Sequence, residues 1–254
     1  GAIEFYNEAR KAGVKPILGM EAYVTRGKRT DREKGDKAHH LVLLARDEAG
    51  FHNLMRLSSL GHLEGFYYKP RVDHELLSRY SKGLVALSAC PQGELAVDLL
   101  ADRDDSALET AMLHRDIFGP EHYFLEIQNH GLDIEEKIRA KVTDLARRTG
   151  LSMVATNDCH YIGKDHTEAQ DLLICIQTGK TVHEHERMRA LAELHFRSPD
   201  EMKHAFPDHL QAVHNTLAVA EQCNVQLQLG KFLLPQFPLP EGWDEPLDDF
   251  AAWR

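Results

Sequence analysis

The sequence predicts an α/β fold, in which short buried strands alternate with helices. Three observations support this prediction: apolar, β-prone runs of four to six residues, helical periodicity between these runs, and glycine or proline at several junctions. About five strand–helix units are visible. Such units build a parallel sheet that is either open or closed into a barrel, and sites in both arrangements lie at the carboxyl ends of strands.

The expected elements follow from local signals along the chain. Gly13 ends the first helix, Asp73 can cap a short helix, and Gly150 ends a long one. Helices are expected at residues 2–12, 48–60, 74–80, 94 onwards, 107–118 and 134–149, followed by a mostly helical region to about 225. Strands or extended segments are expected at 14–18, 21–24, 40–45, 84–88, 123–128 and 151–155. Residues 26–37 should form a charged loop, and 66–73 should be irregular.

Composition limits the class of protein. The 254 residues are 43% hydrophobic and 28% charged, and the formal net charge is −10. This negative charge argues against binding of duplex DNA by this chain alone. We find no run of 18 apolar residues, so no membrane span is expected. The four separated cysteines indicate reduced thiols and a cytoplasmic protein. The chain opens on what looks like a helix interior, and we interpret it as a fragment without its natural N-terminus.

The segment 156–161, TNDCHY, is the most informative one because it follows an apolar run. Alternate residues of a strand point to the same side, so Asp158 and His160 are expected to face together. A carboxylate and an imidazole suit a divalent metal of the zinc or manganese type. Glu21 and Cys90 follow other extended runs and are expected to join this pair. His40 precedes its run, and would need an earlier strand start or an inward loop to reach the others.

Each of these residues also has an ordinary structural interpretation. Glu21 can be a solvated carboxylate, Cys90 a small buried hydrophobe, and His40 a cover for the start of a strand. The motif His183-Glu184-His185 resembles a metal motif but lies in a polar connection with no strand to hold it. The remaining histidines considered are interpreted as surface residues: His52, His62, His114, His166, His183, His185, His204 and His214.

Three basic residues, Lys69, Arg71 and Lys180, lie near apparent strand ends. They are interpreted as surface residues that aid solubility, with contact to phosphate groups as the alternative.

Several segments carry a resemblance to a known family. GAIEFYNEARKAGVKPILGMEAYV, HHLVLLARDEAGFHNLMRLSS, GFYYKPRVDHELL, KGLVALSACPQGEL, FLEIQNHG, VATNDCHY and DLLICIQTGK resemble, in order, the PHP (polymerase and histidinol phosphatase) domain of bacterial DNA polymerase III alpha subunits. The resemblance implies a distorted (β/α)7 barrel that is N-terminally truncated here. It also implies a PHP domain over residues 1–231, then a linker and the start of the polymerase palm over 232–254.

The resemblance implies a metal cluster at one end of the barrel. Five family ligand positions fall on Glu21, His40, Cys90, Asp158 and His160. Four further family ligands lie upstream of the first residue, so we expect the chain as written to bind metal weakly, since a partial ligand shell loses cooperativity. Carboxylates, imidazoles and one thiolate favour Zn²⁺ or Mn²⁺ over Mg²⁺ alone.

Function follows from the same resemblance. It implies part of a DNA-directed DNA polymerase, with nucleotidyl transfer at a Mg²⁺ site outside this chain. The PHP cluster would support a metal-dependent 3′–5′ exonuclease, with Asp158 and His160 as catalytic residues. The implied partners are DNA, deoxynucleoside triphosphates, a sliding clamp and a proofreading subunit. Two alternatives stay open: a stand-alone phosphoesterase of the histidinol phosphatase type, and a non-catalytic module that stabilises the polymerase.

Overall fold

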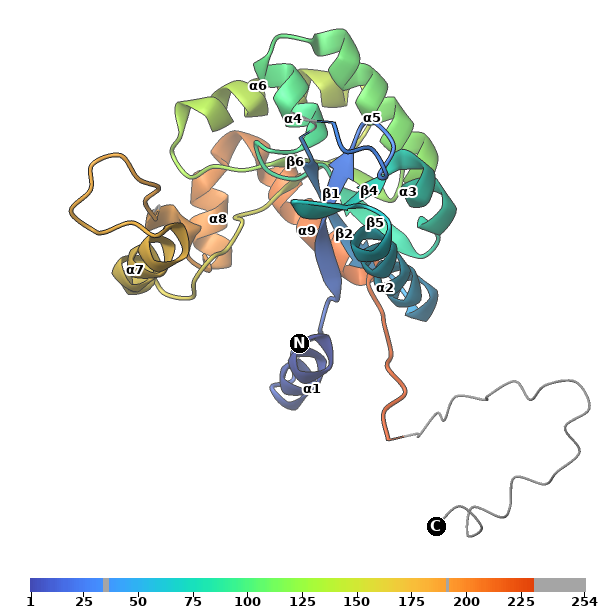
Figure 1. Ribbon diagram of the computed structural model, residues 1–254, viewed down its shortest axis with the longest axis horizontal. Coiled ribbons are helices and arrows are strands. Elements are labelled where there is room, and N and C mark those ends of the chain that lie inside the picture. Colours follow the sequence, from blue (N-terminus) through green and yellow to red (C-terminus); the bar gives the residue numbers. More distant parts are fainter. Residues whose placement is uncertain (34–36, 191, 231–254) are drawn as a thin grey trace, which may run out of the picture.

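The computed structural model describes residues 1–33, 37–190 and 192–230 and shows a mixed α/β fold (Figure 1). The expected linker and palm junction at 232–254 therefore lies outside the described residues. The helices are α1 (Ala2–Lys11), α2 (Glu48–Leu63), α3 (His74–Tyr80), α4 (Glu94–Leu100), α5 (Asp104–Phe118), α6 (Asp133–Thr149), α7 (Thr167–Thr178), α8 (Pro199–Ala205) and α9 (Leu210–Gln222). The strands are β1 (Gly19–Thr25), β2 (His39–Ala45), β3 (Phe66–Tyr67), β4 (Lys69–Asp73), β5 (Leu84–Leu87), β6 (Tyr123–Ile127) and β7 (Met153–Ala155).

The capping signals are confirmed where they bear on the fold. The Asp73 carboxylate accepts a hydrogen bond from the Leu76 N–H at 3.0 Å and starts α3 at the expected residue. Gly150 follows α6 with φ 72°, the left-handed conformation that glycine adopts without steric cost. Two expectations differ from the structure. The strand expected at 21–24 begins earlier, at Gly19, directly after the segment 14–18, and residues 66–73 are not irregular but contain the paired strands β3 and β4.

The strands form one seven-stranded sheet in the order β3-β4-β1-β2-β5-β6-β7, which is open over the described residues. The pairs β1–β4, β5–β6 and β6–β7 are parallel, as expected from strand–helix units. β2 is antiparallel to both β1 and β5, so the expectation of an all-parallel sheet is wrong. β2 follows β1 directly along the chain, and neighbouring strands joined in this way can pair antiparallel.

The two faces of the sheet carry different side chains because strand residues alternate in direction. On β2, Leu41, Leu43 and Ala45 belong to the large core between the sheet and the helices α2 to α6. Val42 and Leu44 point the other way, toward a smaller apolar cluster that includes Val219 of α9. We call the face with the large core, toward α2 to α6, the helix-covered face. We call the opposite face, toward Val219, the α9 face. The same alternation decides to which face each polar residue of the sheet belongs.

The last third of the described chain contains the helices α7, α8 and α9 and none of the sheet strands, as expected. α7 and the loop after it lie at one side of the molecule, away from the sheet (Figure 1). α8 and α9 lead back, and α9 packs against β7. Among the described residues, no helix combines the length and the apolar character needed to cross a membrane.

Candidate metal centre

The pairing of β1 with β2 brings Glu21 and His40 together. Tyr23 lies opposite His40 in the register, and Glu21 is two residues before Tyr23 on the same face. Glu21 Oε1 is 3.1 Å from His40 Nδ1, and the rings of Tyr23 and His40 meet edge-on. Because β2 is antiparallel, its first residues lie beside the carboxyl end of β1. β2 begins at His39, one residue before the apolar run was expected to start, and its direction explains how a histidine at the start of a strand reaches the carboxyl end of β1.

The turn after β5 places Cys90 against His40. Only glycine fits at position 93, because an added Cβ would lie 2.3 Å from the Ser88 carbonyl oxygen. The His40 N–H donates to the Gln92 carbonyl at 3.1 Å, which fixes the turn to the start of β2. The Cys90 Sγ atom is 3.4 Å from His40 Nδ1. His40 therefore contacts two of the other predicted ligands.

Negative charge gathers around the Cys90 thiol. Burial is the main reason that the pKa of Cys90 rises to about 11, and the carboxylates of Asp158, Glu21 and Glu126 raise it further. The thiol is therefore protonated at neutral pH. A bound cation would reverse this preference, because it stabilises the thiolate and offsets the carboxylates. The donor set of this centre thus fits a divalent metal.

Glu126 of β6 is a buried carboxylate that sequence reasoning missed. It is 4% exposed, and burial raises its pKa although it accepts three hydrogen bonds. The Ala89 N–H donates to it at 2.8 Å, and the side chains of Gln128 and Thr156 also donate. These bonds connect the turn that holds Cys90 to the segment after β7. The signal was a single carboxylate inside the apolar strand YFLEI.

Asp158 and His160 are neighbours, but not through strand alternation. β7 ends at Ala155, and Asp158 has φ 41°, so the expectation that both residues extend a strand is wrong. The His160 Nδ1 atom lies 3.8 Å from Asp158 Oδ1 and 2.7 Å from the Asp158 carbonyl oxygen. Asp158 is near enough to act on the pKa of Cys90, whereas the contacts of the His160 ring lie within its own segment.

A buried ion pair, His130 with Glu135, contacts the backbone of the segment that carries Asp158 and His160. His130 is 7% exposed and Glu135 is 3% exposed, and His130 Nδ1 lies 2.5 Å from Glu135 Oε1. The other ring nitrogen, Nε2, lies 2.9 Å from the Asn157 carbonyl oxygen, next to Asp158. Burial opposes protonation of His130, but the bonds to Glu135 and Asn157 outweigh it and raise the pKa of His130. Burial likewise opposes ionisation of Glu135, and the bonds from His130 outweigh it and lower the pKa of Glu135.

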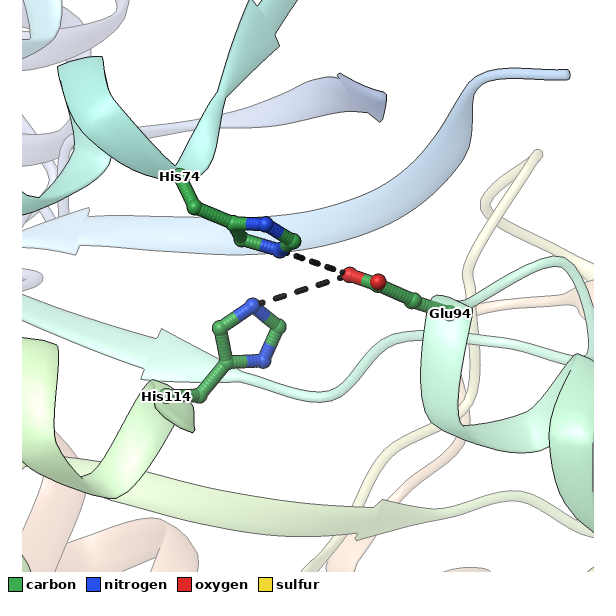
Figure 2. A group of neighbouring side chains, drawn as sticks. All are labelled: His74, Glu94 and His114. Atoms are coloured by element: carbon green, nitrogen blue, oxygen red, sulfur yellow. Dashed lines mark hydrogen bonds and ion pairs between the residues drawn. The ribbon is translucent and has the colours of Figure 1, made fainter. Parts of the chain in front are cut away.

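A second group of metal-competent side chains lies on the helix-covered side. His74, Glu94 and His114 come from α3, α4 and α5, and their donor atoms all lie within 4.8 Å of one another (Figure 2). Among the described residues, the five predicted ligands do not form such a group, because they are linked pairwise through His40 and through the segment after β7. The structure thus contains a histidine–glutamate–histidine group placed to bind a metal ion.

The interpretation of His114 as a surface residue is wrong, because this ring is 2% exposed and lies between Glu94 and Tyr123. Burial lowers the pKa of His114 to about 4, so the ring is neutral. The other histidines interpreted as surface residues are exposed: His52, His62, His166, His183, His185, His204 and His214.

Arg71 is also misplaced by sequence reasoning. It is 1% exposed and donates to the carbonyl oxygens of Gly65, Arg29 and Asp31. Its guanidinium therefore holds the loop after β1, and is not a surface group that could contact phosphate.

The mixed sheet covered by helices, with candidate metal donors beside β1, β2 and β5, is that of an α/β domain of the PHP class. The profile of the PHP domain family matches residues 1–130, and the chain belongs to this family.

The chain is similar over nearly its whole length to DNA polymerase III alpha subunits. It is 43% identical to that of Thermus aquaticus, over 96% of this chain and 21% of the relative. Identity is 41% to the protein of Treponema pallidum over 94% of this chain, and 42% to that of Deinococcus radiodurans over 95%. The chain spans about a fifth of the length of these relatives.

Proposed function

We propose that this chain is the PHP part of a replicative DNA polymerase, a DNA polymerase III alpha subunit, and that it hydrolyses phosphodiester bonds as a 3′–5′ exonuclease. The observation that carries this proposal is the convergence on His40, where Glu21 lies at 3.1 Å and Cys90 at 3.4 Å in a PHP-family chain. Polymerisation itself, with its Mg²⁺ ions and deoxynucleoside triphosphates, belongs to the remainder of the longer protein, as do contacts with a sliding clamp and a proofreading subunit. We assign the protein to the cytoplasm.

The residues that would hold Zn²⁺ or Mn²⁺ are Glu21, His40, Cys90, Asp158 and His160. Bound cations would polarise the phosphodiester and stabilise the leaving oxygen. Support for this assignment comes from the mixture of oxygen, nitrogen and sulfur donors, which suits borderline metals. It also comes from the carboxylates around Cys90, since each raises the pKa of the thiol and leaves negative charge for a cation to offset.

The chain's own residues order the centre. Glu126 and the His130–Glu135 pair hold the turn of Cys90 and the segment of Asp158 from two sides. Asp158 and His160 are the most exposed of the predicted donors together with Glu21, so they are the ones that a DNA end can reach. We therefore assign Asp158 and His160 the role nearest to the scissile phosphate.

The test uses the intact polymerase that contains this chain. The double substitution Asp158→Ala and His160→Ala should abolish release of 3′ nucleotides from single-stranded DNA in Mn²⁺ or Zn²⁺, with primer extension unchanged. His52→Ala is the matched control, because His52 is an exposed histidine of α2 far along the sheet from the segment after β7. Undiminished exonuclease activity in the double variant would contradict the proposal.

Metal analysis separates the remaining alternatives. Near-stoichiometric metal that falls on substitution of Asp158 and His160 supports the exonuclease. Absence of bound metal in the intact protein would instead identify a structural module. Hydrolysis of small phosphate monoesters without action on DNA would favour the histidinol phosphatase type of activity.

A further inference from the structure

We propose that His74, Glu94 and His114 form a second divalent-metal site, of the zinc type, which joins three helices on the helix-covered side of the sheet. His74 and Glu94 are the first residues of α3 and α4, and His114 lies in the last turns of α5. The three side chains point toward one another across the space between these helices (Figure 2). This site does not depend on the proposed exonuclease function.

The spacing of the donor atoms suits a small ion. The Glu94 Oε2 atom lies 3.0 Å from His74 Nε2 and 3.8 Å from His114 Nε2. Zinc binds nitrogen and oxygen at about 2.0–2.1 Å in a tetrahedron, which separates neighbouring donors by about 3.3 Å. The two observed distances lie on either side of that value. Small side-chain rotations are therefore enough to enclose an ion.

His114 supplies an independent reason to expect a ligand. Its Nε2 atom is buried and has no hydrogen-bond partner among the described residues, although the ring is 2% exposed. A buried polar atom without a partner is unusual in a folded protein and calls for an explanation such as an ion. In the observed arrangement of the three side chains this nitrogen has no partner, and a metal ion in front of it would provide one.

Neighbouring groups orient the donors as outer-shell partners of metal sites do. The Tyr123 hydroxyl lies 3.4 Å from His114 Nδ1, so a proton on Nδ1 leaves the lone pair of Nε2 directed at Glu94. Arg26 Nε lies 3.2 Å from Glu94 Oε1 and leaves Oε2 to the two histidines. Asp98, 2.7 Å from the Arg26 guanidinium, compensates its charge.

Access and separation also agree with a distinct site. The His74 side chain is 21% exposed, so an ion and a completing water molecule can enter from its side. His39, which interacts with Glu94, and His40, which contacts Glu21, are adjacent on β2 and point to opposite faces. The second site therefore lies across the sheet from the candidate exonuclease centre. An ion there would fix α4 and, with it, the turn that carries Cys90.

Cobalt titration of the chain distinguishes the two sites, because only the candidate exonuclease centre contains a thiol, that of Cys90. In a Cys90→Ser, Asp158→Asn background, Co²⁺ should still bind with the visible absorption of a tetrahedral nitrogen–oxygen site and without a thiolate band. Adding His74→Ala or His114→Gln to this background should abolish binding of one equivalent of Co²⁺, or lower the affinity for that ion at least about tenfold. Zn²⁺ should displace the Co²⁺ stoichiometrically.

His52→Ala in the same background is the control and should leave Co²⁺ binding unchanged. His74 is partly exposed, so its alanine variant should keep the circular dichroism spectrum of the parent even if His114→Gln does not fold. A folded His74→Ala variant that binds Co²⁺ with the parent's stoichiometry and affinity would overturn the proposal. Absence of Co²⁺ binding in the background variant would overturn it as well.

Discussion

Replacement of His130 by alanine tests whether the buried pair under the 156–160 segment holds that segment in place. The substitution removes the 2.5 Å contact with Glu135 and the 2.9 Å contact with the Asn157 carbonyl oxygen. It leaves a carboxylate that is 3% exposed without its counter-charge. We therefore expect a loss of stability together with weaker metal binding at Asp158.

The size of the loss follows from these contacts. Removing one partner of a buried ion pair costs about 3–5 kcal/mol, because the remaining charge is uncompensated. The lost hydrogen bond to Asn157 adds about 1 kcal/mol. The backbone N–H of residue 130 still donates to Glu135, at 2.6 Å in the parent, and this bond keeps the total near the lower end. We expect His130→Ala to lower the free energy of unfolding by about 3–4 kcal/mol.

Urea denaturation at pH 6 measures this change. With a slope of about 3 kcal/mol/M, the midpoint should fall by about 1 M at unchanged slope. The double variant His130→Ala, Glu135→Ala should lose clearly less than the sum of the two single variants, since it leaves no buried charge. The control is His204→Ala, because His204 is an exposed residue of α8; this substitution should change the free energy of unfolding by less than about 0.5 kcal/mol. A loss below about 1 kcal/mol for His130→Ala, or additivity in the double variant, would refute the reasoning.

The difference in the free energy of unfolding between the parent and His130→Ala should also depend on pH, which provides a second readout. The pKa of His130 is raised above 6.5, so its contribution is complete below that value and is lost as pH rises through the raised pKa. The pKa of Glu135 is lowered below 4.5, so its contribution is present above that value and is lost as pH falls through the lowered pKa. The stability difference between parent and His130→Ala should therefore be largest from about pH 5 to 6.5. A difference that grows toward alkaline pH would contradict the assignment.

Three further substitutions test the framework by denaturation. Gly50→Ala should destabilise by at least about 1–3 kcal/mol, because its Cβ would lie 1.8 Å from the Gly83 carbonyl oxygen; a neutral result would show that the first turn of α2 and the turn before β5 can separate freely. Ser198→Ala should cost about 1 kcal/mol through loss of the capping box with Glu201, without any change in metal binding. Arg71→Met should cost about 1–3 kcal/mol or more by leaving buried carbonyl groups unpaired, and an unchanged midpoint would argue against its structural role.

Local signals were sufficient for most elements of the fold. Asp73 specified the start of α3 through its own side chain, and Gly150 specified the end of α6 through its left-handed backbone. β2, β5, β6 and β7 were recognised because their apolar runs are short and continuous, whereas β3 and β4 were missed because they carry no such run. Strand direction was not accessible in the same way, since an apolar run such as that of β2 carries no signal of whether it pairs parallel or antiparallel. The position of His40 beside Glu21 became clear only with the antiparallel register.

For the site as well, the sequence indicated some residues, and the positions of others became clear only in the folded structure. The sequence named Glu21, His40 and Cys90 as candidate ligands, and the structure places Glu21 and Cys90 in contact with His40, although Glu21 lies within β1 and not at its end. His114 could not be recognised, because nothing in the composition of α5 tells which of its faces meets α4. Arg71 could not be recognised either, since its partners are backbone carbonyls from a distant loop, and these carry no side-chain signature.

The adjacency of His39 and His40 constrains how β2 can change during evolution. A slip of one residue would exchange the two imidazoles between the faces and turn Leu41 and Leu43 out of the core. Insertions or deletions are therefore tolerable only in the loops on either side, and this strand can diverge by point substitution alone.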